Sequence, residues 1–383
     1  MPQTYKYEAI SAKGITNLNE HIDILLVTVT PVESKALHDL LKPLPGKTTI
    51  LKSSKEILTY SLGVLGNYKV CHVESKMGSV GIGSSLMTIQ QAIADWNPKI
   101  IIMVGIAFGI DSKKQKIGDV LVSEHVMQYQ NEKVTKTGKK ENRGDKHRCS
   151  PTLLDRFKSY HTDWNYPITK RAISSVLTGD ILSGEVLIDN IDHRDDLLER
   201  FPTAIGGEME GVGLANAAIV KAKDWIVVKS ICDFADGNKR KNKESRQKLA
   251  AGAAASLCEF ILNHNFVFED FGIDALLVTP ELEDTQPIEI KENLSLDKIK
   301  TPEIPGLTDN GMESDMKLTR AFFGQSVSSR FRIGTRLGLV DDEEIKSGDN
   351  VEISTQILVR AKQKGLLGQI WSILFKNDPN PFN

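Results

Sequence analysis

Residues 205–213 read Ile-Gly-Gly-Glu-Met-Glu-Gly-Val-Gly, in which two carboxylates flank one methionine and glycines surround them. The alanine-rich segment from Gly211 to about Lys221 predicts a helix that starts at this turn. Acidic residues near a helix N-terminus complement the helix dipole, which is one interpretation of Glu208 and Glu210. That interpretation does not explain the glycines, which have no side chains and so let a ligand approach the backbone closely. The stretch therefore predicts either a helix start or a binding site with two carboxylates.

A second informative stretch, residues 225–237, reads Trp-Ile-Val-Val-Lys-Ser-Ile-Cys-Asp-Phe-Ala-Asp-Gly. Its apolar part predicts a buried strand that carries Asp233 and Asp236 at its carboxyl end, where a carboxyl can be held away from bulk water. For Asp236 we favour a structural role as the cap of the following helix. Glu33 follows the first predicted strand in the same way, either as a catalytic candidate or as an acid at a helix start.

Short β-branched runs alternate with amphipathic segments from Ile22 onward, which is the pattern of an α/β sheet. Several runs are almost continuous Val, Ile and Leu, typical of strands buried on both faces. Apolar residues at helical spacing predict a helix that ends before Asn97-Pro98, and a further helix covers about Gln247–Asn263. The predicted strands are Ile22–Thr30, Tyr68–Glu74, Ile100–Val104, Asp119–Glu124, Ala172–Thr178 and Trp225–Ile231.

The composition argues against several classes of protein. Among 383 residues, 48 Lys and Arg nearly balance 50 Asp and Glu, so binding to nucleic acid is not expected. The four cysteines are far apart and form no C-x-x-C pair, which argues against a zinc site or disulfide framework and favours a reducing cytoplasm. The N-terminal residues lack the apolar core of a signal peptide, and no apolar run reaches the ~20 residues that span a bilayer. We expect a cytoplasmic protein that does not enter a membrane.

The character of the chain changes after the α/β segment. We predict an N-terminal extension over 1–20, an α/β domain over 21–265, a linker over 266–310 and a small all-α bundle over 311–380. The linker region is rich in proline and acidic residues. Its stretch FGIDALLVT at 271–279 is β-like and suits an edge strand.

Common nucleotide and metal motifs are absent from the sequence. There is no G-x-x-x-x-G-K-[ST], no H-E-x-x-H and no G-x-G-x-x-G after the first predicted strand. Two glycine clusters, at 78–83 and 105–109, do follow apolar strands. Such loops either let a ligand approach the backbone at the carboxyl ends of strands or are plain tight turns.

Three segments together resemble the purine nucleoside phosphorylase and nucleosidase superfamily, in particular its methylthioadenosine/S-adenosylhomocysteine nucleosidase branch. They are GDILSGEVLI at 179–188, FPTAIGGEMEG at 201–211 and VVKSICDFADG at 227–237, in the order of the family. The resemblance covers about Ile22 to Asn263. It implies a phosphorylase/nucleosidase-like α/β catalytic domain, with a mixed central sheet flanked by helices.

The resemblance also implies roles for individual residues. Asp233 would protonate or hydrogen-bond N7 of a purine, and Glu33 would position the attacking water. Glu210 would hold the ribose hydroxyls, with Met209 beneath the sugar. Breaking an N-glycosidic bond builds positive charge on the sugar and negative charge on the leaving base, so three carboxyls suit this reaction without a metal or organic cofactor. The other residues expected at the substrate are Leu187, Ile188, Gly105, Ala107, Phe108, Ser75 and Gly78, with Leu187 and Ile188 in the base-pocket segment where the family often has a stacking aromatic.

Water is the expected nucleophile, because Met103–Gly109 lacks the arginine that helps to bind phosphate in bacterial phosphorylases of this superfamily. A phosphate-dependent phosphorylase stays the enzymatic alternative. The segments around Gly105 and Lys116 are similar to nucleosidase domains of bacterial defence systems and fungal immune receptors, some of which cleave ATP, and this favours adenine nucleotides as substrates. The nearby basic residues are either a solvated loop or contacts for 5′-phosphates, the candidates being Lys113, Lys114, Lys116 and Arg143.

The predicted C-terminal bundle resembles small death-like effector-associated domains, through Phe322-Phe323-Gly324, Arg336–Leu339 and Ile357–Leu367. This implies an effector of an antiviral or conflict system that an adaptor or sensor protein activates through the bundle, and homo-oligomers are common in the superfamily. The alternative is a helical extension that covers part of the enzyme or its oligomer interface. A third hypothesis makes the α/β domain a non-catalytic nucleotide-sensing or scaffold module, although such a module has no need for an acid at N7.

Overall fold

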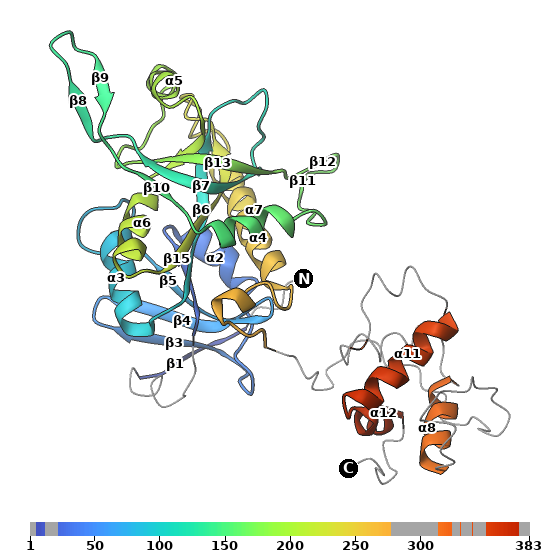
Figure 1. Ribbon diagram of the computed structural model, residues 1–383. Helices are drawn as coiled ribbons and strands as arrows, with labels where there is room; N and C mark the ends of the chain where they lie inside the picture. The colour runs from blue at the N-terminus through green and yellow to red at the C-terminus, as the bar shows by residue number, and fades with distance from the viewer. Residues whose placement is uncertain are drawn as a thin grey trace. The chain divides into compact units, whose positions relative to one another are not determined.

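The computed structural model describes residues 5–11, 22–276, 313–323, 330, 339 and 350–374. The chain divides into two compact units, Met1–Thr279 and Pro280–Asn383. Figure 1 shows the first unit as a sheet with helices on both sides and the second as a group of helices.

Within its described residues, the first unit contains one large sheet and two short two-stranded ribbons. The strands of the large sheet are β1 (Tyr7–Ala9), β2 (Ile24–Thr28), β3 (Ile50–Lys55), β4 (Leu58–Leu65), β5 (Tyr68–Glu74), β6 (Ile100–Gly109), β7 (Val120–Gln128), β10 (Lys146–Arg148), β13 (Val176–Ser183), β14 (Ala204–Glu208) and β15 (Asp224–Asp233). The ribbons pair β8 (Glu132–Val134) with β9 (Lys140–Asn142), and β11 (Pro167–Thr169) with β12 (Ala172–Ile173).

The large sheet is mixed and partly closed. Its order is β1-β3-β4-β5-β2-β6-β14-β13-β7-β10, and β15 pairs with both β6 and β7. Because β6, β14, β13, β7 and β15 pair in a closed circuit, this half of the sheet curls on itself. The neighbours β5, β2, β6 and β15 run parallel, so their carboxyl ends reach the same edge.

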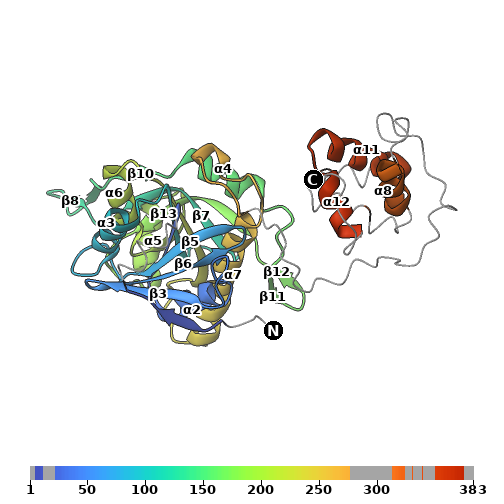
Figure 2. The ribbon, with the colours of Figure 1, turned by 90° about the horizontal axis from the view of Figure 1, so that it is seen from below.

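Helices cover both faces of this sheet (Figures 1 and 2). α2 packs against α7 on one face, and α3 packs against α6 on the other. The alanines of α7 are buried against β6 and β15, which lets helix and sheet approach closely. The helices are α2 (Pro31–His38), α3 (Ser85–Trp96), α4 (Pro151–Ser159), α5 (Ile191–Arg200), α6 (Gly211–Val220) and α7 (Lys243–Leu262), followed by a 3-10 turn at Glu269–Phe271.

The predicted mixed α/β fold is confirmed, and most of its predicted elements are present. β5 has the predicted bounds, and α3 ends before Asn97, whose φ of 46° is left-handed. The strand predicted over Ala172–Thr178 is wrong in detail, because the short β12 ends at Ile173 and β13 begins only at Val176. β3, β4 and β14 have no predicted counterpart, since β3 and β4 mix polar with apolar residues and β14 is glycine-rich.

The edges of the first unit also differ from the prediction. β1, which lies in the predicted N-terminal extension, pairs in parallel with β3. The first residues of the predicted linker, 266–276, pack on the core of the first unit through Val267, Phe268 and Ile273. No strand forms at the described residues 271–276 of the predicted edge strand, and 277–279 lie outside the described residues.

The described part of the second unit consists of α8 (Glu313–Phe323), α11 (Asn350–Gln363) and α12 (Leu367–Leu374). A turn with Gly365 at a φ of 68° separates α11 from α12. The apolar residues Ile357, Leu358, Ala361, Leu367, Ile370 and Leu374 are buried together, and Leu366 packs against them. Of the Arg336–Leu339 segment that carries the resemblance to effector-associated domains, only Leu339 is among the described residues. In the described ranges, no helix is long and apolar enough to cross a membrane.

Candidate active site

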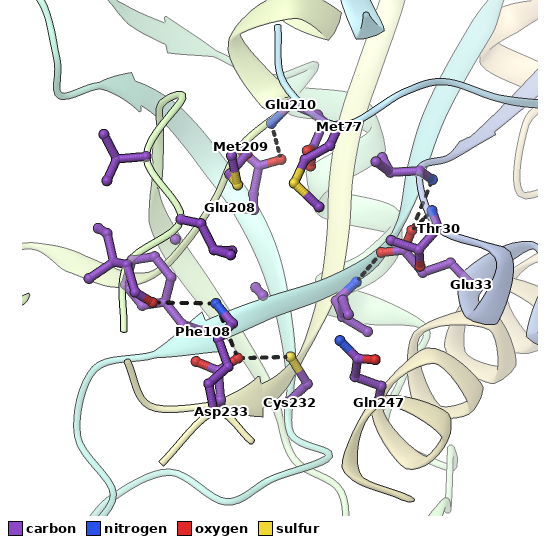
Figure 3. Close-up of a pocket in the computed structure, with 18 residues that line it drawn as sticks. Thr30, Glu33, Met77, Phe108, Glu208, Met209, Glu210, Cys232, Asp233 and Gln247 are labelled. Atoms are coloured by element: carbon purple, nitrogen blue, oxygen red, sulfur yellow. Dashed lines mark hydrogen bonds and ion pairs between the residues drawn. The ribbon is translucent and has the colours of Figure 1, made fainter. Parts of the chain in front are cut away.

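A cavity opens at the carboxyl ends of β2, β6 and β15 (Figure 3). The turn after β14 and the loop after β13 complete its wall. Its lining joins four carboxyls to mainly apolar side chains, a composition typical of a small-molecule site. The lining residues are Val29, Thr30, Glu33, Met77, Ile106, Ala107, Phe108, Val186, Leu187, Ile188, Gly207, Glu208, Met209, Glu210, Cys232, Asp233, Lys239 and Gln247.

Glu33 is buried in the first turn of α2, and backbone donors fix its carboxylate. Its Oε2 accepts hydrogen bonds from the N–H groups of Val29 (2.9 Å) and Thr30 (2.7 Å), and its Oε1 accepts one from Ile106 (2.7 Å). A carboxylate offers about four lone-pair positions, so one acceptor position remains at Oε1. Glu33 is therefore both an acid at a helix start and a group able to hold one more donor in the cavity.

The two carboxylates of the 208–210 turn have different partners. Glu208 accepts hydrogen bonds from the N–H groups of Glu210 (3.0 Å) and Gly211 (2.9 Å), so it caps the start of α6. Glu210 instead accepts a hydrogen bond at Oε1 from the N–H of Gly78 (3.0 Å). Burial raises the pKa of Glu210 to about 7 although Lys229 opposes the rise, and Glu208 adds to it. The interpretation as a helix-start acid thus holds for Glu208, while Glu210 is available to a ligand.

Lys229 is a fully buried cation on β15 between two of these carboxylates. Its Nζ lies 3.7 Å from Oε1 of Glu33 and 3.7 Å from Oε2 of Glu210. Burial opposes its charge, but the neighbouring carboxylates outweigh burial and raise the pKa of Lys229. Gly105 leaves room for this cluster, because a Cβ at that position would lie 2.0 Å from Oε1 of Glu33 and 2.9 Å from Nζ of Lys229.

Asp233 ends β15 and is held from three sides. Its Oδ1 accepts a hydrogen bond from the N–H of Ala235 (3.0 Å), and its Oδ2 accepts one from Sγ of Cys232 (3.2 Å). Nζ of Lys239 lies 3.7 Å from the same Oδ2. The prediction that Asp236 caps the following helix is wrong, because α7 begins at Lys243 with Asn242 as its N-cap, and Asp236 Oδ1 instead accepts from Asn238 N–H (3.2 Å) in a turn.

The apolar end of the cavity is formed by Phe108 from β6 and by the loop after β13. Tyr129 holds this loop, since its hydroxyl donates a hydrogen bond to the carbonyl of Val186 (3.3 Å). Lys239 Nζ donates to the carbonyl of Ile188 (3.3 Å) and so ties the loop to the Asp233 side. Leu187 lines the cavity but is 57% exposed, which leaves Phe108 as the aromatic surface at this end.

The other predicted substrate residues divide into three groups. Ala107 and Met209 line the cavity. Gly78 and Gly105 do not line it but support it, by donating to Glu210 and by making room beside Glu33. Ser75 does not reach it, because its N–H and hydroxyl both donate to the carbonyl of Thr28.

None of the four candidates for 5′-phosphate contacts lines the cavity. Lys114 and Lys116 lie beside Asp111 (3.6 Å) and Asp119 (3.7 Å), and Lys113 belongs to the same loop. Arg143 follows β9 and pairs with Glu141 (3.5 Å), on a ribbon that projects from the sheet in Figure 1. Sequence proximity to a glycine loop therefore misplaced these cations.

Several lining or supporting residues were not predicted from the sequence. A lysine in an otherwise apolar buried strand is unusual, and this signal singles out Lys229. The basic run from Lys239 onward directly follows the Asp233 motif and is a second usable signal. The remaining unpredicted lining residues are Val29, Thr30, Met77, Ile106, Val186, Gly207, Cys232 and Gln247, and Glu208 was predicted only as one of the two carboxylates of the 208–210 turn.

Negatively charged groups outnumber positively charged groups in and around the cavity. Four lining carboxyls face the two ammonium groups of Lys229 and Lys239. Among the residues that the structure describes, no group of three or more His, Cys, Asp or Glu is arranged to hold a metal ion. The chemistry available from this chain's own residues is therefore proton transfer and charge stabilisation by carboxyls.

The model of the Phosphorylase superfamily matches residues 23–263, so the chain belongs to this superfamily. The resemblance inferred from the three sequence segments is thereby confirmed. The three segments carry this resemblance although the sequence has none of the metal-binding or nucleotide-triphosphate motifs that were considered.

Among curated relatives, the "Death domain-containing ATP nucleosidase" of Amphimedon queenslandica is 28% identical over 268 residues, which cover 65% of this chain and 49% of that protein. The chain thus spans about half the length of that relative. The 5′-methylthioadenosine/S-adenosylhomocysteine nucleosidase of Staphylococcus epidermidis is 27% identical over 182 residues, covering 46% of this chain and 74% of that protein. A solved nucleosidase of the same name from Colwellia psychrerythraea, in complex with adenine, has a TM-score of 0.53 at 20% identity, over 63% of this chain and 95% of that one.

Proposed function

We propose that the chain is a purine nucleosidase that hydrolyses the N-glycosidic bond of an adenine nucleotide or nucleoside, with ATP favoured, to free adenine and the corresponding ribose phosphate or ribose. One observation carries the proposal: Asp233, Glu210 and Glu33 line a single cavity although they come from three distant parts of the sequence. The names of the relatives in Amphimedon and Staphylococcus support it.

We assign each of the three carboxyls one part of the hydrolysis, and the surroundings of each carboxyl suit that part. Water forms a bond to C1′ while the C1′–N9 bond breaks and its electron pair passes to the purine, which takes a proton at N7 from Asp233. Glu33 holds the water through its remaining acceptor position and receives its proton. Glu210 accepts hydrogen bonds from the ribose hydroxyls, so its negative charge stabilises the cationic sugar of the transition state.

Water is favoured over phosphate as the nucleophile by the charge of the cavity. The cation at the Glu33 side is Lys229, which already lies between two carboxylates. A phosphate dianion placed there would face Glu33 and Glu210 and would lose its hydration without gaining a free cation. A neutral water molecule meets no such cost.

The two-unit organisation supports the wider role. We propose an effector of a conflict or antiviral system whose C-terminal helices receive an adaptor or sensor protein. The Amphimedon relative, which is named as containing a death domain, supports a C-terminal interaction module of this kind. The exposed Val80, Ile82 and Leu187 near the cavity support a homo-oligomer. Four buried, unpaired cysteines support a cytoplasmic location.

The test is release of free adenine from ATP, AMP, adenosine and methylthioadenosine by the full chain, with and without phosphate. We expect release that does not require phosphate and that Asp233→Asn lowers by about 10²–10⁴. Asp236→Asn is the matched control, because Asp236 belongs to the same loop but bonds only within its own turn in the described structure. Release that depends on phosphate would establish the phosphorylase instead. If Asp233→Asn releases adenine as fast as the parent chain, the catalytic assignment is wrong.

A further inference from the structure

The roles given to the carboxyls leave two polar residues of the cavity without an assignment. Thr30 and Gln247 lie at the end of the cavity away from Phe108 (Figure 3). The base belongs beside Phe108 and Asp233, and the ribose beside Glu210, so the 5′ carbon of the sugar points toward this polar end. An apolar 5′ group would be poorly matched to a hydroxyl and an amide.

A shallow, open hollow of exposed residues lies around the start of α7, in parts of the chain next to residues that line the cavity. At two places, a residue that lines the cavity is followed directly in the chain by a residue that lines the hollow. Lys239 lines the cavity and the next residue, Arg240, lines the hollow. Likewise Gln247 lines the cavity and Lys248 lines the hollow. Consecutive Cα atoms are about 3.8 Å apart, so the backbone that lines the cavity continues directly into the backbone that lines the hollow at both places. The hollow is lined by Arg240, Asn242, Lys243, Glu244, Ser245 and Lys248.

The hollow carries excess positive charge. Glu244 pairs with Lys248 at 2.7 Å, whereas Arg240 and Lys243 have no carboxylate partner in the described part of the chain. α7 begins at Lys243, so the positive end of its dipole adds to these cations. This charge contrasts with the cavity itself, where carboxyls are in excess.

We propose that this hollow binds the 5′-polyphosphate of the nucleotide, with Arg240 and Lys243 as its main contacts. The inference rests on the proposed nucleosidase function and names the part of the substrate that the hollow holds. Gln247 and Lys243 are four residues apart on α7, so their side chains are neighbours at roughly 5–6 Å along one face of the helix. A phosphate chain that leaves the ribose past Gln247 meets Lys243 one turn further on. These residues replace the loop cations that the sequence suggested.

The decisive measurement is the ratio of kcat/KM for ATP to kcat/KM for adenosine, which lacks the phosphates. We expect the double variant Arg240→Ala/Lys243→Ala to lower this ratio at least tenfold, because charge-assisted contacts to phosphate are lost. The matched control is Lys113→Ala/Lys114→Ala, which removes two exposed cations outside both spaces and is expected to leave the ratio unchanged. An unchanged ratio in the first variant, or an equal fall in both, overturns the proposal.

A binding experiment separates this inference from the proposed reaction. Inorganic tripolyphosphate is titrated calorimetrically into the full chain carrying Asp233→Asn, where no turnover interferes. Binding that Arg240→Ala/Lys243→Ala weakens about tenfold, and that added KCl weakens further, supports the hollow as a phosphate site even if no adenine release is seen. Absence of binding, or binding that the double variant does not weaken, overturns the phosphate site while leaving nucleoside hydrolysis to its own assay.

Discussion

At the scale of single residues, Lys229 is the group on which two proposed catalytic carboxylates depend. Its ammonium is fully buried and lies 3.7 Å from both Glu33 and Glu210. A buried charge that loses its counter-charge is strongly unfavourable, so the three groups stabilise one another as a set. Gly105 supplies the space that the set needs.

We therefore expect Lys229→Met to lower the free energy of unfolding by about 3–5 kcal/mol and to lower kcat by about 10²–10⁴. The two carboxylates would lose the cation between them and repel each other, which displaces the group proposed to hold water. Urea unfolding and adenine release measure the two effects. Lys223→Met is the control, because Lys223 precedes β15 and donates only to Asn97 Oδ1 (2.7 Å) at the surface. A Lys229→Met protein as active as the parent would contradict the proposed cluster.

Glu210 predicts a dependence on pH. Its pKa of about 7 lies above the ordinary value of 4.5, so kcat/KM should rise with pH through about 7 as the carboxylate that we propose to bind the ribose hydroxyls forms. For stability the sign is opposite. Between pH 4.5 and 7 the folded chain keeps a proton that the unfolded chain has lost, so the contribution of Glu210 to the free energy of unfolding falls as pH rises.

The measurement compares the parent chain with Glu210→Gln, whose side chain does not titrate. Relative to this variant, the parent should be more stable at pH 5 than at pH 7.5 in urea unfolding. Any residual activity of the variant should lack the acidic limb near pH 7. A stability difference that is the same at both pH values would contradict the assignment.

At the scale of elements, the start of α6 positions Glu210, which is the proposed ribose-binding carboxylate. Glu208 caps α6 and at the same time fixes the N–H of Glu210, so the cap sets the position of the carboxylate next to it in the chain. We expect Glu208→Ala to cost about 1–2 kcal/mol of stability and to raise KM. Ser150→Ala on α4 is the control, since Ser150 caps a helix through Leu153 N–H (3.4 Å) away from the cavity. If Glu208→Ala lowers stability as the control does but leaves KM unchanged, Glu208 does not position Glu210 for substrate binding.

The elements also show what a sequence can and cannot reveal. β2, β6 and β15 could be predicted because strands buried on both faces are continuously apolar, and Asp233 and Glu33 could be predicted because each comes at or after the end of such a strand.

β14 could not be predicted, because its glycines carry no strand signal and its place depends on the backbone of β6 beside it. The contact of Lys229 with Glu33 and Glu210 joins β15, the first turn of α2 and the turn before α6, which are far apart in sequence, so no local pattern contains it. Proximity in sequence likewise misassigned Lys113 and Arg143.

At the scale of the whole molecule, the two units have separate apolar cores. Every residue that lines the cavity lies between Val29 and Gln247, in the first unit. The described core of the second unit is far smaller and centres on residues of α8, α11 and α12, such as Phe322 and Ile357. Smaller cores bury a smaller fraction of their surface, so the second unit should unfold first.

Calorimetry of the full chain should therefore show two transitions, with the second unit unfolding at the lower temperature. Ile357→Ala should lower only that transition, because a cavity in its core costs about 2–5 kcal/mol there, and basal adenine release should stay unchanged. Ile102→Ala in β6 is the reciprocal variant and should lower only the upper transition. A single transition that both variants shift would mean that the two cores unfold as one, and the chemistry of the first unit would then depend on the helices of the second.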